Sequence, residues 1–176
     1  MLGRTRTNGN FTITSGVVTI SNNAELIVEG NTEIKGYNAH VYNHGVFETN
    51  NFTLMYAAIN GGGTGYYHQN DASAKLIING NSSFNGTSYS DITNGIVVFD
   101  GTEQQTVGHL KAYNIEVLNL NGIKYLSNIH VYGNYNLHGN PLDNANYDTY
   151  LYENATLTKG SDYGDLYMAA RMDAAV

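Results

Sequence analysis

One segment of this chain recurs, and its recurrence limits the fold more than any other feature. Residues 24–34 read Ala-Glu-Leu-Ile-Val-Glu-Gly-Asn-Thr-Glu-Ile, and residues 74–84 read Ala-Lys-Leu-Ile-Ile-Asn-Gly-Asn-Ser-Ser-Phe. Residues 129–137 repeat the last nine positions, and residues 46–54 form a weaker copy with Asn in place of Gly. The shared pattern is aliphatic-x-aliphatic-x-Gly-Asn-x-x-apolar. Such a unit cannot bury its apolar side chains alone, so it must stack on copies of itself.

Turn-forming residues between short alternating runs favour stacked strands over helices. The chain of 176 residues contains 25 Asn and 20 Gly, including six Asn-Gly pairs, and both residue types tolerate the backbone of tight turns. The inward-pointing apolar residues that mark successive coils recur at intervals of about twenty residues, as in β-helix repeats. The sequence therefore predicts an all-β fold, a single-stranded right-handed parallel β-helix (β-solenoid).

The alternation also predicts which side chains point inward and which occupy the corners. The expected core residues are Leu26, Val28, Val46, Leu76, Ile78, Phe99, Ile115, Val117, Ile129, Val131 and Leu151. Asn31, Asn81 and Asn134 each follow a Gly, and we expect them at equivalent corners. There, their amides can hydrogen bond to adjacent coils and satisfy backbone groups that the turn leaves unpaired.

The chain divides into three parts by composition. We expect an N-terminal arm over residues 1–10, the solenoid over 11–160, and a C-terminal tail over 161–176. Residues 60–71 have no period and predict a loop that leaves one corner. Residues 165–175 lack Gly, Pro and Asn and favour a short helix, with a frayed tail as the alternative.

Charge and composition exclude several kinds of partner. The formal charge is −7 and the sequence pI is about 5.1, which argues against nucleic acid and anionic membranes because both require clustered Lys and Arg. No run of 18 apolar residues and no signal-peptide pattern occurs, so we expect no membrane insertion. The absence of Cys excludes disulfides and thiolate metal sites and does not locate the protein.

Two segments resemble repetitive bacterial surface and secreted proteins. Residues 97–107 and 113–117 resemble the Phe-x-Gly-Thr, Gln-Thr-Val and Asn-Leu-x-Ile elements of Bacteroidetes-type surface repeats. The Gly-Asn-Tyr-Asn-Leu of residues 133–137 is similar to filamentous-haemagglutinin-like and autotransporter-type β-helices. The resemblance implies an extracellular or cell-surface location, with display, adhesion or filament building as the role.

Tyrosines at outward positions are the candidate ligand contacts. The chain has 15 Tyr and no Trp, and outward Tyr can stack on sugar rings or fill an interface. The alternative is that these rings are cross-strand partners that stabilise the solenoid itself. The candidates are Tyr66, Tyr67, His68, Tyr132, Tyr150 and Tyr152.

Charged residues near the two chain ends are the candidates for an interface between copies of the chain. Arg4 and Arg6 make the first ten residues positive, whereas Asp162, Asp165 and Asp173 make the tail negative. Opposite charges at the two ends favour head-to-tail contact between copies, which need not close and so can give a filament. Flexible, solvated tails with incidental charges are the alternative.

Groups that carry catalytic chemistry are not evident in the sequence. The carboxylate pairs Asp162 with Asp165 and Asp100 with Glu103 are explained by solvated corners, and the spacing of His40 and His44 suits a metal only on a helix. We therefore expect no enzyme activity, no cofactor and no metal site.

The sequence is compatible with three functions. The first is an extracellular structural protein whose subunits assemble end to end into a filament or surface fibre, with itself as partner. The second is a carbohydrate-binding or adhesion module of a bacterial surface protein or phage tail fibre, with glycans as partners. The third, a polysaccharide-active enzyme or tailspike fragment, depends on fold analogy alone.

Overall fold

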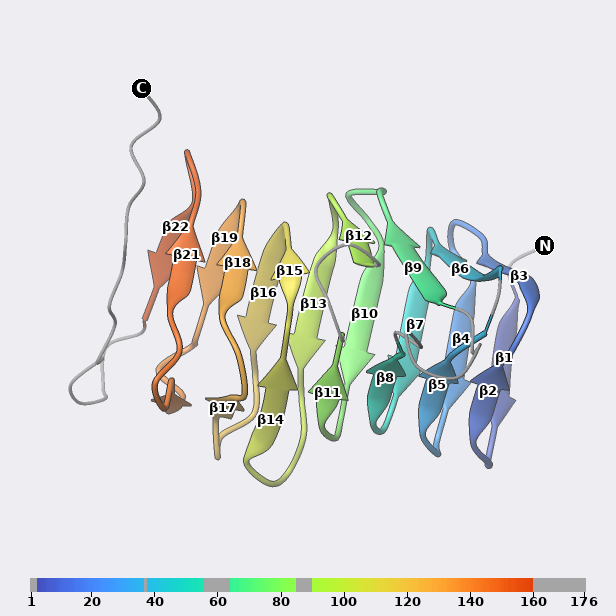
Figure 1. Ribbon diagram of the computed structural model, residues 1–176, viewed down its shortest axis with the longest axis horizontal. Coiled ribbons are helices and arrows are strands. Elements are labelled where there is room, and N and C mark those ends of the chain that lie inside the picture. Colours follow the sequence, from blue (N-terminus) through green and yellow to red (C-terminus); the bar gives the residue numbers. More distant parts are fainter. Residues whose placement is uncertain (1–2, 37, 56–63, 85–89, 160–176) are drawn as a thin grey trace.

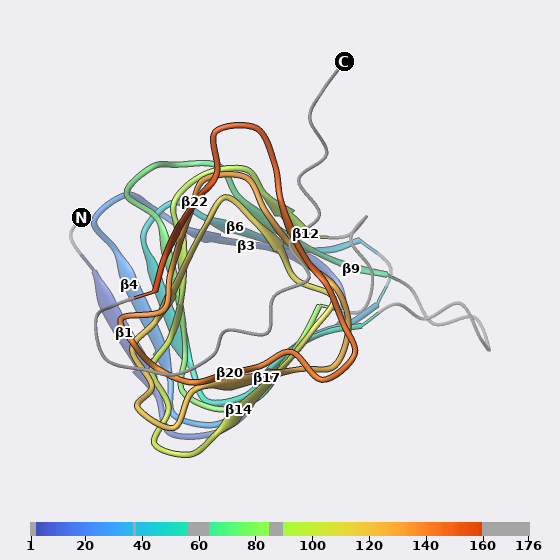
Figure 2. The ribbon, with the colours of Figure 1, turned by 90° about the vertical axis from the view of Figure 1, so that its left-hand side faces the viewer.

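The structure is a computed structural model that describes residues 3–36, 38–55, 64–84 and 90–159. In this part of the chain every regular element is a β-strand, and the strands form parallel sheets. The chain winds through about 7 turns of a solenoid, whose coils lie side by side in Figure 1 and are three-sided when seen along the axis in Figure 2. The expected all-β, parallel β-solenoid is confirmed. The helix expected at 165–175 and the tail 161–176 lie outside the described residues.

Each coil contributes one strand to each of three faces. The first face is an 8-stranded sheet in which every third strand of the chain is a neighbour. Its strands are β1 (Arg4–Thr7), β4 (Glu25–Val28), β7 (Val46–Thr49), β10 (Lys75–Ile78), β13 (Ile96–Phe99), β16 (Asn114–Val117), β19 (Asn134–Asn136) and β22 (Thr156–Thr158).

The second face is a 7-stranded sheet with the same order of coils. Its strands are β2 (Phe11–Ile13), β5 (Thr32–Ile34), β8 (Phe52–Leu54), β11 (Ser82–Ser83), β14 (Gln105–Gly108), β17 (Ile123–Tyr125) and β20 (Leu142–Asp143).

The third face differs because it consists of two sheets rather than one. Four strands form the first sheet: β3 (Gly16–Ile20), β6 (Ala39–Asn43), β9 (Gly65–Gln69) and β12 (Ser90–Ile92). Three form the second: β15 (Lys111–Ala112), β18 (Ile129–Val131) and β21 (Thr149–Leu151). Strands β12 and β15 lie near each other, but no strand pairing joins them. We call this interruption the seam.

The core is a column of inward side chains stacked from coil to coil. Leu76 pairs in register with Phe47 on one side and Val97 on the other, and all three are fully buried. Burying one such side chain contributes roughly 1.5–3 kcal/mol. Alternation along each strand supplies these positions, because successive side chains point to opposite sides of a sheet.

Most of the predicted core is confirmed. The buried members are Val28, Leu76, Ile78, Phe99, Ile115, Val117, Ile129 and Val131. Leu26 and Leu151 are half-buried and pack against this cluster.

The prediction for Val46 is wrong, since Phe47 takes the inward position. Leu26 pairs with Phe47, and Thr32 pairs with Phe52, so the corner after β7 is one residue shorter than the corner after β4. Because side chains alternate, that single residue exchanges inside for outside.

Asparagine side chains connect the coils at the corner between the first and second faces. Asn10 Oδ1 accepts from the backbone N–H of Asn31 at 2.9 Å, and Asn51 Nδ2 donates to Asn31 Oδ1 at 2.8 Å. Asn51 Oδ1 accepts from the N–H of Asn81 at 2.6 Å, and Asn81 Oδ1 accepts from the N–H of Thr106 at 2.7 Å. The expected role of corner amides is confirmed for Asn31 and Asn81.

Asn134 does not occupy an equivalent corner, which corrects the expectation. It follows β18 of the third face and begins β19 of the first face. It belongs to a separate ladder, in which its N–H donates to Asn114 Oδ1 at 2.8 Å and its Oδ1 accepts from Thr156 Oγ1 at 3.0 Å. The same local sequence therefore serves two different corners of the coil.

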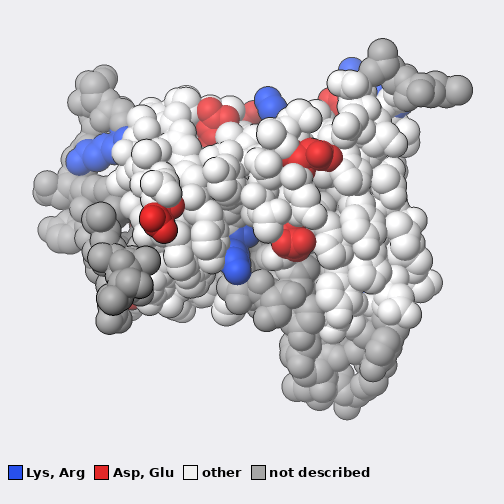
Figure 3. All heavy atoms as spheres, turned by 90° about the horizontal axis from the view of Figure 1, so that it is seen from above, with Lys and Arg blue, Asp and Glu red and all other residues white. Residues whose placement is uncertain are grey.

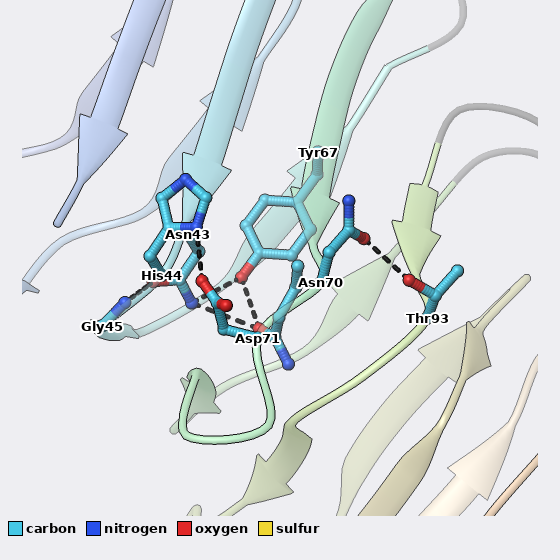
Figure 4. Close-up of polar contacts among 8 residues, drawn as sticks. Asn43, His44, Gly45, Tyr67, Asn70, Asp71 and Thr93 are labelled. Carbon is cyan, nitrogen blue, oxygen red and sulfur yellow. Dashed lines mark hydrogen bonds and ion pairs between the residues drawn. The ribbon is translucent and has the colours of Figure 1, made fainter. Parts of the chain in front are cut away.

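A polar network is buried inside the solenoid where the third face meets the first (Figure 4). Asn43 Nδ2 donates to Tyr67 Oη at 2.9 Å, to Gln69 Oε1 at 3.1 Å and to the carbonyl of Lys75 at 2.8 Å. Tyr67 in turn donates to Gln69 Oε1 at 2.9 Å. All three side chains are fully buried, and the network satisfies their polar atoms.

Two segment boundaries differ from expectation. Residues 65–69, expected in a loop over 60–71, form strand β9, while residues 56–63 lie outside the described part. Residues 4–7, expected in an N-terminal arm, form β1 and pair with β4, so the solenoid begins there.

Candidate functional site: an aromatic face and its seam

The outward side of the third face carries aromatic rings in two groups. His40 and Tyr42 of β6 lie beside Tyr66 and His68 of β9. On the other side of the seam, His130 of β18 and Tyr132 lie beside Tyr150 of β21 and Tyr152. These eight rings are the aromatic face.

Within each group the rings stack along the solenoid axis. The centroids of His40 and Tyr66 are 4.6 Å apart, and those of Tyr42 and His68 are 4.5 Å apart, with interplanar angles of 6° and 9°. These separations match the spacing of about 4.8 Å between neighbouring strands. The cross-strand ladder expected as the alternative role of the outward rings is therefore present.

The second group has the same geometry. Centroids of His130 and Tyr150 are 4.8 Å apart, and those of Tyr132 and Tyr152 are 4.1 Å apart, each pair with an interplanar angle of 9°. His130 Nδ1 also lies 2.9 Å from Tyr152 Oη. Because stacked rings cover each other, a ligand can reach a ring face only at the end of a stack.

The seam provides such an end, in the form of a surface pocket of about 270 Å³. Its walls are residues 90–93 from the β12 side, Lys111 and Tyr113 from the β15 side, and Tyr132 from the next coil. The connection from β14 to β15 is two residues long, and His109 in it has a positive φ of 53°. β12 and β15 are the edges of their two sheets, so backbone groups at the seam are not engaged in a ladder between them.

Tyr132 is the last ring of its stack on the seam side. Tyr152 stacks on one face of the ring, and Lys111 Nζ lies over the ring at 5.2 Å from its centroid. Tyr113 precedes Tyr132 by one coil and lies against Gly133, where an added Cβ would be 3.0 Å from Tyr113 Cδ1. The ring of Tyr132 therefore lines the pocket together with an ammonium group.

Two charges of opposite sign face this pocket from its two sides. Asp91 lies on β12, its side chain is 51% exposed, and its carboxylate is 3.8 Å from His68 Nδ1. Lys111 lies on β15. Burial lowers the pKa of His68, although Asp91 opposes that shift, and burial together with Lys111 lowers the pKa of His130. The neutral forms of both imidazoles are thus favoured in the folded protein.

Thr93 is fixed at the rim of the pocket. Its Oγ1 lies 2.8 Å from the side-chain amide of Asn70 (Figure 4). Nearby, His44 Nδ1 lies 2.5 Å from Asp71 Oδ2. This pair connects two coils in the same way as His68 and Asp91 but does not line the pocket.

The predicted ligand-contact residues lie in different places in the structure. Tyr66, His68, Tyr132, Tyr150 and Tyr152 belong to the aromatic face, and only Tyr132 also lines the pocket. The prediction that Tyr67 contacts a ligand is wrong, because Tyr67 points inward, is fully buried and joins the network with Asn43. Its neighbours Tyr66 and His68 point outward because side chains alternate along β9.

The interface candidates at the N-terminus are engaged within the chain. Arg4 Nε is 2.9 Å from Glu25 Oε2, and Arg6 Nε donates to Glu29 Oε1 at 2.7 Å. Each Arg therefore has an acidic partner on the second coil. Asp162, Asp165 and Asp173 lie outside the described residues.

Sequence reasoning missed Asp91, Lys111 and Tyr113. Asp91 lies about twenty positions before Lys111 and Tyr113, and nothing in the local sequence connects it with them. Tyr42 and His40 could have been found, because they have the same outward phase on β6 that Tyr66 and His68 have on β9.

Charges elsewhere are sparse. In the view from above, acidic and basic side chains are scattered among uncharged residues, without a patch of one sign (Figure 3). Within the described ranges, no three His, Asp or Glu side chains are grouped so as to hold a metal ion. In the same ranges, no helix is long and apolar enough to cross a membrane.

Fold and pocket together define the class as a β-solenoid with an aromatic outer face. No family model, no curated protein and no solved structure matches this chain.

Proposed function

We propose that this protein is a carbohydrate-binding module that holds a glycan at the seam of its aromatic face. The observation that carries this proposal is the pocket of about 270 Å³, in which the Tyr132 ring lies beside one anionic and one cationic side chain. Sugar sites combine aromatic rings, which contact the C–H groups of the sugar, with a few polar groups that fix its hydroxyls.

The arrangement of the face supports a glycan over a compact ligand. Rings continue on both sides of the pocket, through His68 on one side and Tyr150 on the other. Their edges are available to sugar units that flank the one in the pocket. A role in adhesion outside the cell or at its surface, by binding rather than catalysis, is part of this proposal.

A glycan array followed by calorimetry tests the proposal. Tyr132→Ala removes the ring in the pocket, and we expect a loss of affinity of tenfold or more, equivalent to about 1.4 kcal/mol. Tyr66→Ala removes an outward tyrosine of the same face that stacks on His40 and does not line the pocket, so its affinity should stay within about twofold of the wild type. Equal losses in both variants, or no bound glycan, would contradict the proposal.

End-to-end assembly into a filament is the second candidate, and it is favoured by the two ends of the core. The partly buried apolar side chains that pack against the core lie in the first two and the last coils. They include Phe11, Val18, Leu26, Leu142, Leu151 and Leu157. A second copy stacked on either end would cover such side chains.

The edge strand β1 offers a specific test of assembly. The backbone carbonyls of Gly3 and Thr7 accept hydrogen bonds from N–H groups of the second coil. Because backbone groups alternate in direction along a strand, the N–H and C=O of Arg6 point the other way, towards the free edge of β1. Arg6→Pro removes the N–H from that edge, whereas Arg6→Ala removes only the side chain. If copies pair through β1, light scattering should show assembly for Arg6→Ala and not for Arg6→Pro. A wild type that stays monomeric at every concentration would exclude a filament.

A further inference from the structure

The seam pocket has a charge pattern that bears on which sugar it can accept. Asp91 and Lys111 face it from opposite walls, and neither charge is paired with the other. The contact of Asp91 is His68, at 3.8 Å, and that of Lys111 is the ring of Tyr132, at 5.2 Å from its centroid. Both charged groups therefore have capacity left for a ligand.

The two groups have complementary hydrogen-bonding roles. An ionised carboxylate only accepts and can take two O–H donors at once, while an ammonium group only donates. Adjacent hydroxyls on a sugar ring supply both roles, since each can donate to Asp91 or accept from Lys111. Hydrogen bonds to charged groups are the stronger ones, so such contacts would fix the orientation of the ring.

The same pair of charges disfavours charged sugars. A uronic acid with its carboxylate towards Asp91, or an amino sugar with its ammonium towards Lys111, would be repelled, and the reverse orientation would occupy the charged group that otherwise binds hydroxyls. Like charges at close range are unfavourable, particularly where the surroundings are partly desolvated. A neutral sugar meets neither repulsion.

Pocket size limits the ligand to one ring. The volume of about 270 Å³ is just below the range of about 300–1,000 Å³ that is usual for drug-sized ligands. One pyranose fits this space, with its neighbours in a chain lying outside over the aromatic face.

We propose that the seam pocket binds one neutral hexopyranose unit, with Asp91 accepting from two adjacent hydroxyls, Lys111 donating to another and the edge of the Tyr132 ring contacting C–H groups of the sugar. This inference rests on the proposed carbohydrate-binding function and specifies its ligand class. Asp91 and Lys111 determine specificity by what they repel as well as by what they bind.

The test measures the binding of three kinds of probe: methyl glycosides of neutral hexoses, glucuronic acid and glucosamine. Protein-observed NMR titration of the wild type should show binding of at least one neutral glycoside and weaker binding of both charged sugars. Asp91→Asn should weaken the neutral sugar tenfold or more and raise the relative affinity for glucuronic acid. Lys111→Met should weaken the neutral sugar and raise the relative affinity for glucosamine.

Asp71→Asn is the matched control, because Asp71 also pairs with a histidine across coils but does not line the pocket. Its affinities should equal those of the wild type, and thermal unfolding of every variant checks that the fold is intact. Neutral binding that is unaffected by Asp91→Asn and Lys111→Met would overturn this inference and leave the carbohydrate-binding function standing. A wild type that binds glucuronic acid or glucosamine more tightly than the neutral glycosides would also overturn this inference, and the carbohydrate-binding function would still stand. Failure of every glycan on an array would overturn both proposals.

Discussion

The phenolic oxygens of Tyr125 and Tyr135 lie 2.6 Å apart in the interior of the solenoid. Both side chains are fully buried, and Thr149 Oγ1 donates to Tyr125 Oη at 3.2 Å. Burial raises the pKa of Tyr125 to about 12 and raises that of Tyr135 well above its ordinary value. Tyr67, buried in the network with Asn43, has a raised pKa for the same reason.

These three tyrosines predict loss of stability in alkali. In the unfolded chain a tyrosine ionises near pH 10, whereas the folded protein holds the proton of Tyr125 up to about pH 12. Its stabilisation is fully present below pH 10 and is lost as pH rises through 12, by about 1.4 kcal/mol per pH unit in this range. Urea unfolding at several pH values measures this slope.

Tyrosinate absorbance supplies the second readout for this prediction. The buried tyrosines should ionise only together with loss of the far-ultraviolet circular dichroism of the strands. In Tyr125→Phe one ionisable group is gone, so stability should fall less steeply with pH. Full ionisation of all 15 tyrosines in a protein that keeps its strands would contradict the assignment.

The stacked core predicts a large difference between two neighbouring positions on β10. Leu76→Asp places a carboxylate between Phe47 and Val97, and it should lower the free energy of unfolding by about 3–5 kcal/mol. Ile77→Asp changes the next residue, which points outward, and should cost about 1 kcal/mol. Chemical denaturation of both variants measures the difference, and equal costs would rule out the stacking.

The corner ladder predicts a smaller but specific effect. Asn51→Ala removes the acceptor of the Asn81 N–H and the donor to Asn31 at an exposed corner, where water can replace part of both contacts. We expect a loss of about 1 kcal/mol in unfolding free energy. Asn50→Ala, at the exposed neighbouring position, is the control and should change stability by less than about 0.5 kcal/mol. The ladder would be unimportant if both variants unfolded at the same denaturant concentration as the wild type.

Gly95 and Gly16 allow the cost of backbone strain to be separated from the cost of a steric clash, because both have a positive φ and only one has close neighbours. Gly95 and Gly16 have φ values of 69° and 85°, so alanine is strained at both by about 1–2 kcal/mol. An added Cβ at Gly95 would also be 2.3 Å from the carbonyl oxygen of Ala74, whereas at Gly16 it meets nothing within 4 Å. Gly95→Ala should therefore cost about 1–3 kcal/mol more than Gly16→Ala. Melting temperatures of the two variants provide the comparison, and similar values would refute the close approach of the coils at Gly95.

The local sequence pattern was sufficient to predict the fold class. It failed at positions that depend on the length of a corner or on which corner a repeat occupies. The alternation in residues 74–84 identifies Leu76 and Ile78 as inward, because alternation is a property of a single strand. It fails at Val46, where a corner shorter by one residue shifts the phase. It also fails at Asn134, because the repeat pattern does not say which of three corners a copy occupies.

The candidate site was harder to predict than the fold. Alternation identifies the outward tyrosines at 132, 150 and 152, but the aperiodic sequence around Tyr67 predicts a loop, whereas Tyr67 is buried in a strand. Nothing in the sequence indicated that the third face is interrupted between β12 and β15. At this interruption the structure has a pocket, and Asp91 and Lys111 line it from its two sides.

The sequence by itself determined that this chain forms short strands, turns at Gly and Asn, and stacks its copies into a solenoid. Those properties depend on side-chain alternation and backbone preference within a few residues. The tertiary structure decided the register between coils, the ends of the ring stacks and the position of the seam. These depend on the length of every corner and on how each coil packs on the previous one, so contacts such as that of Lys111 with Tyr132 are fixed only when the whole stack forms.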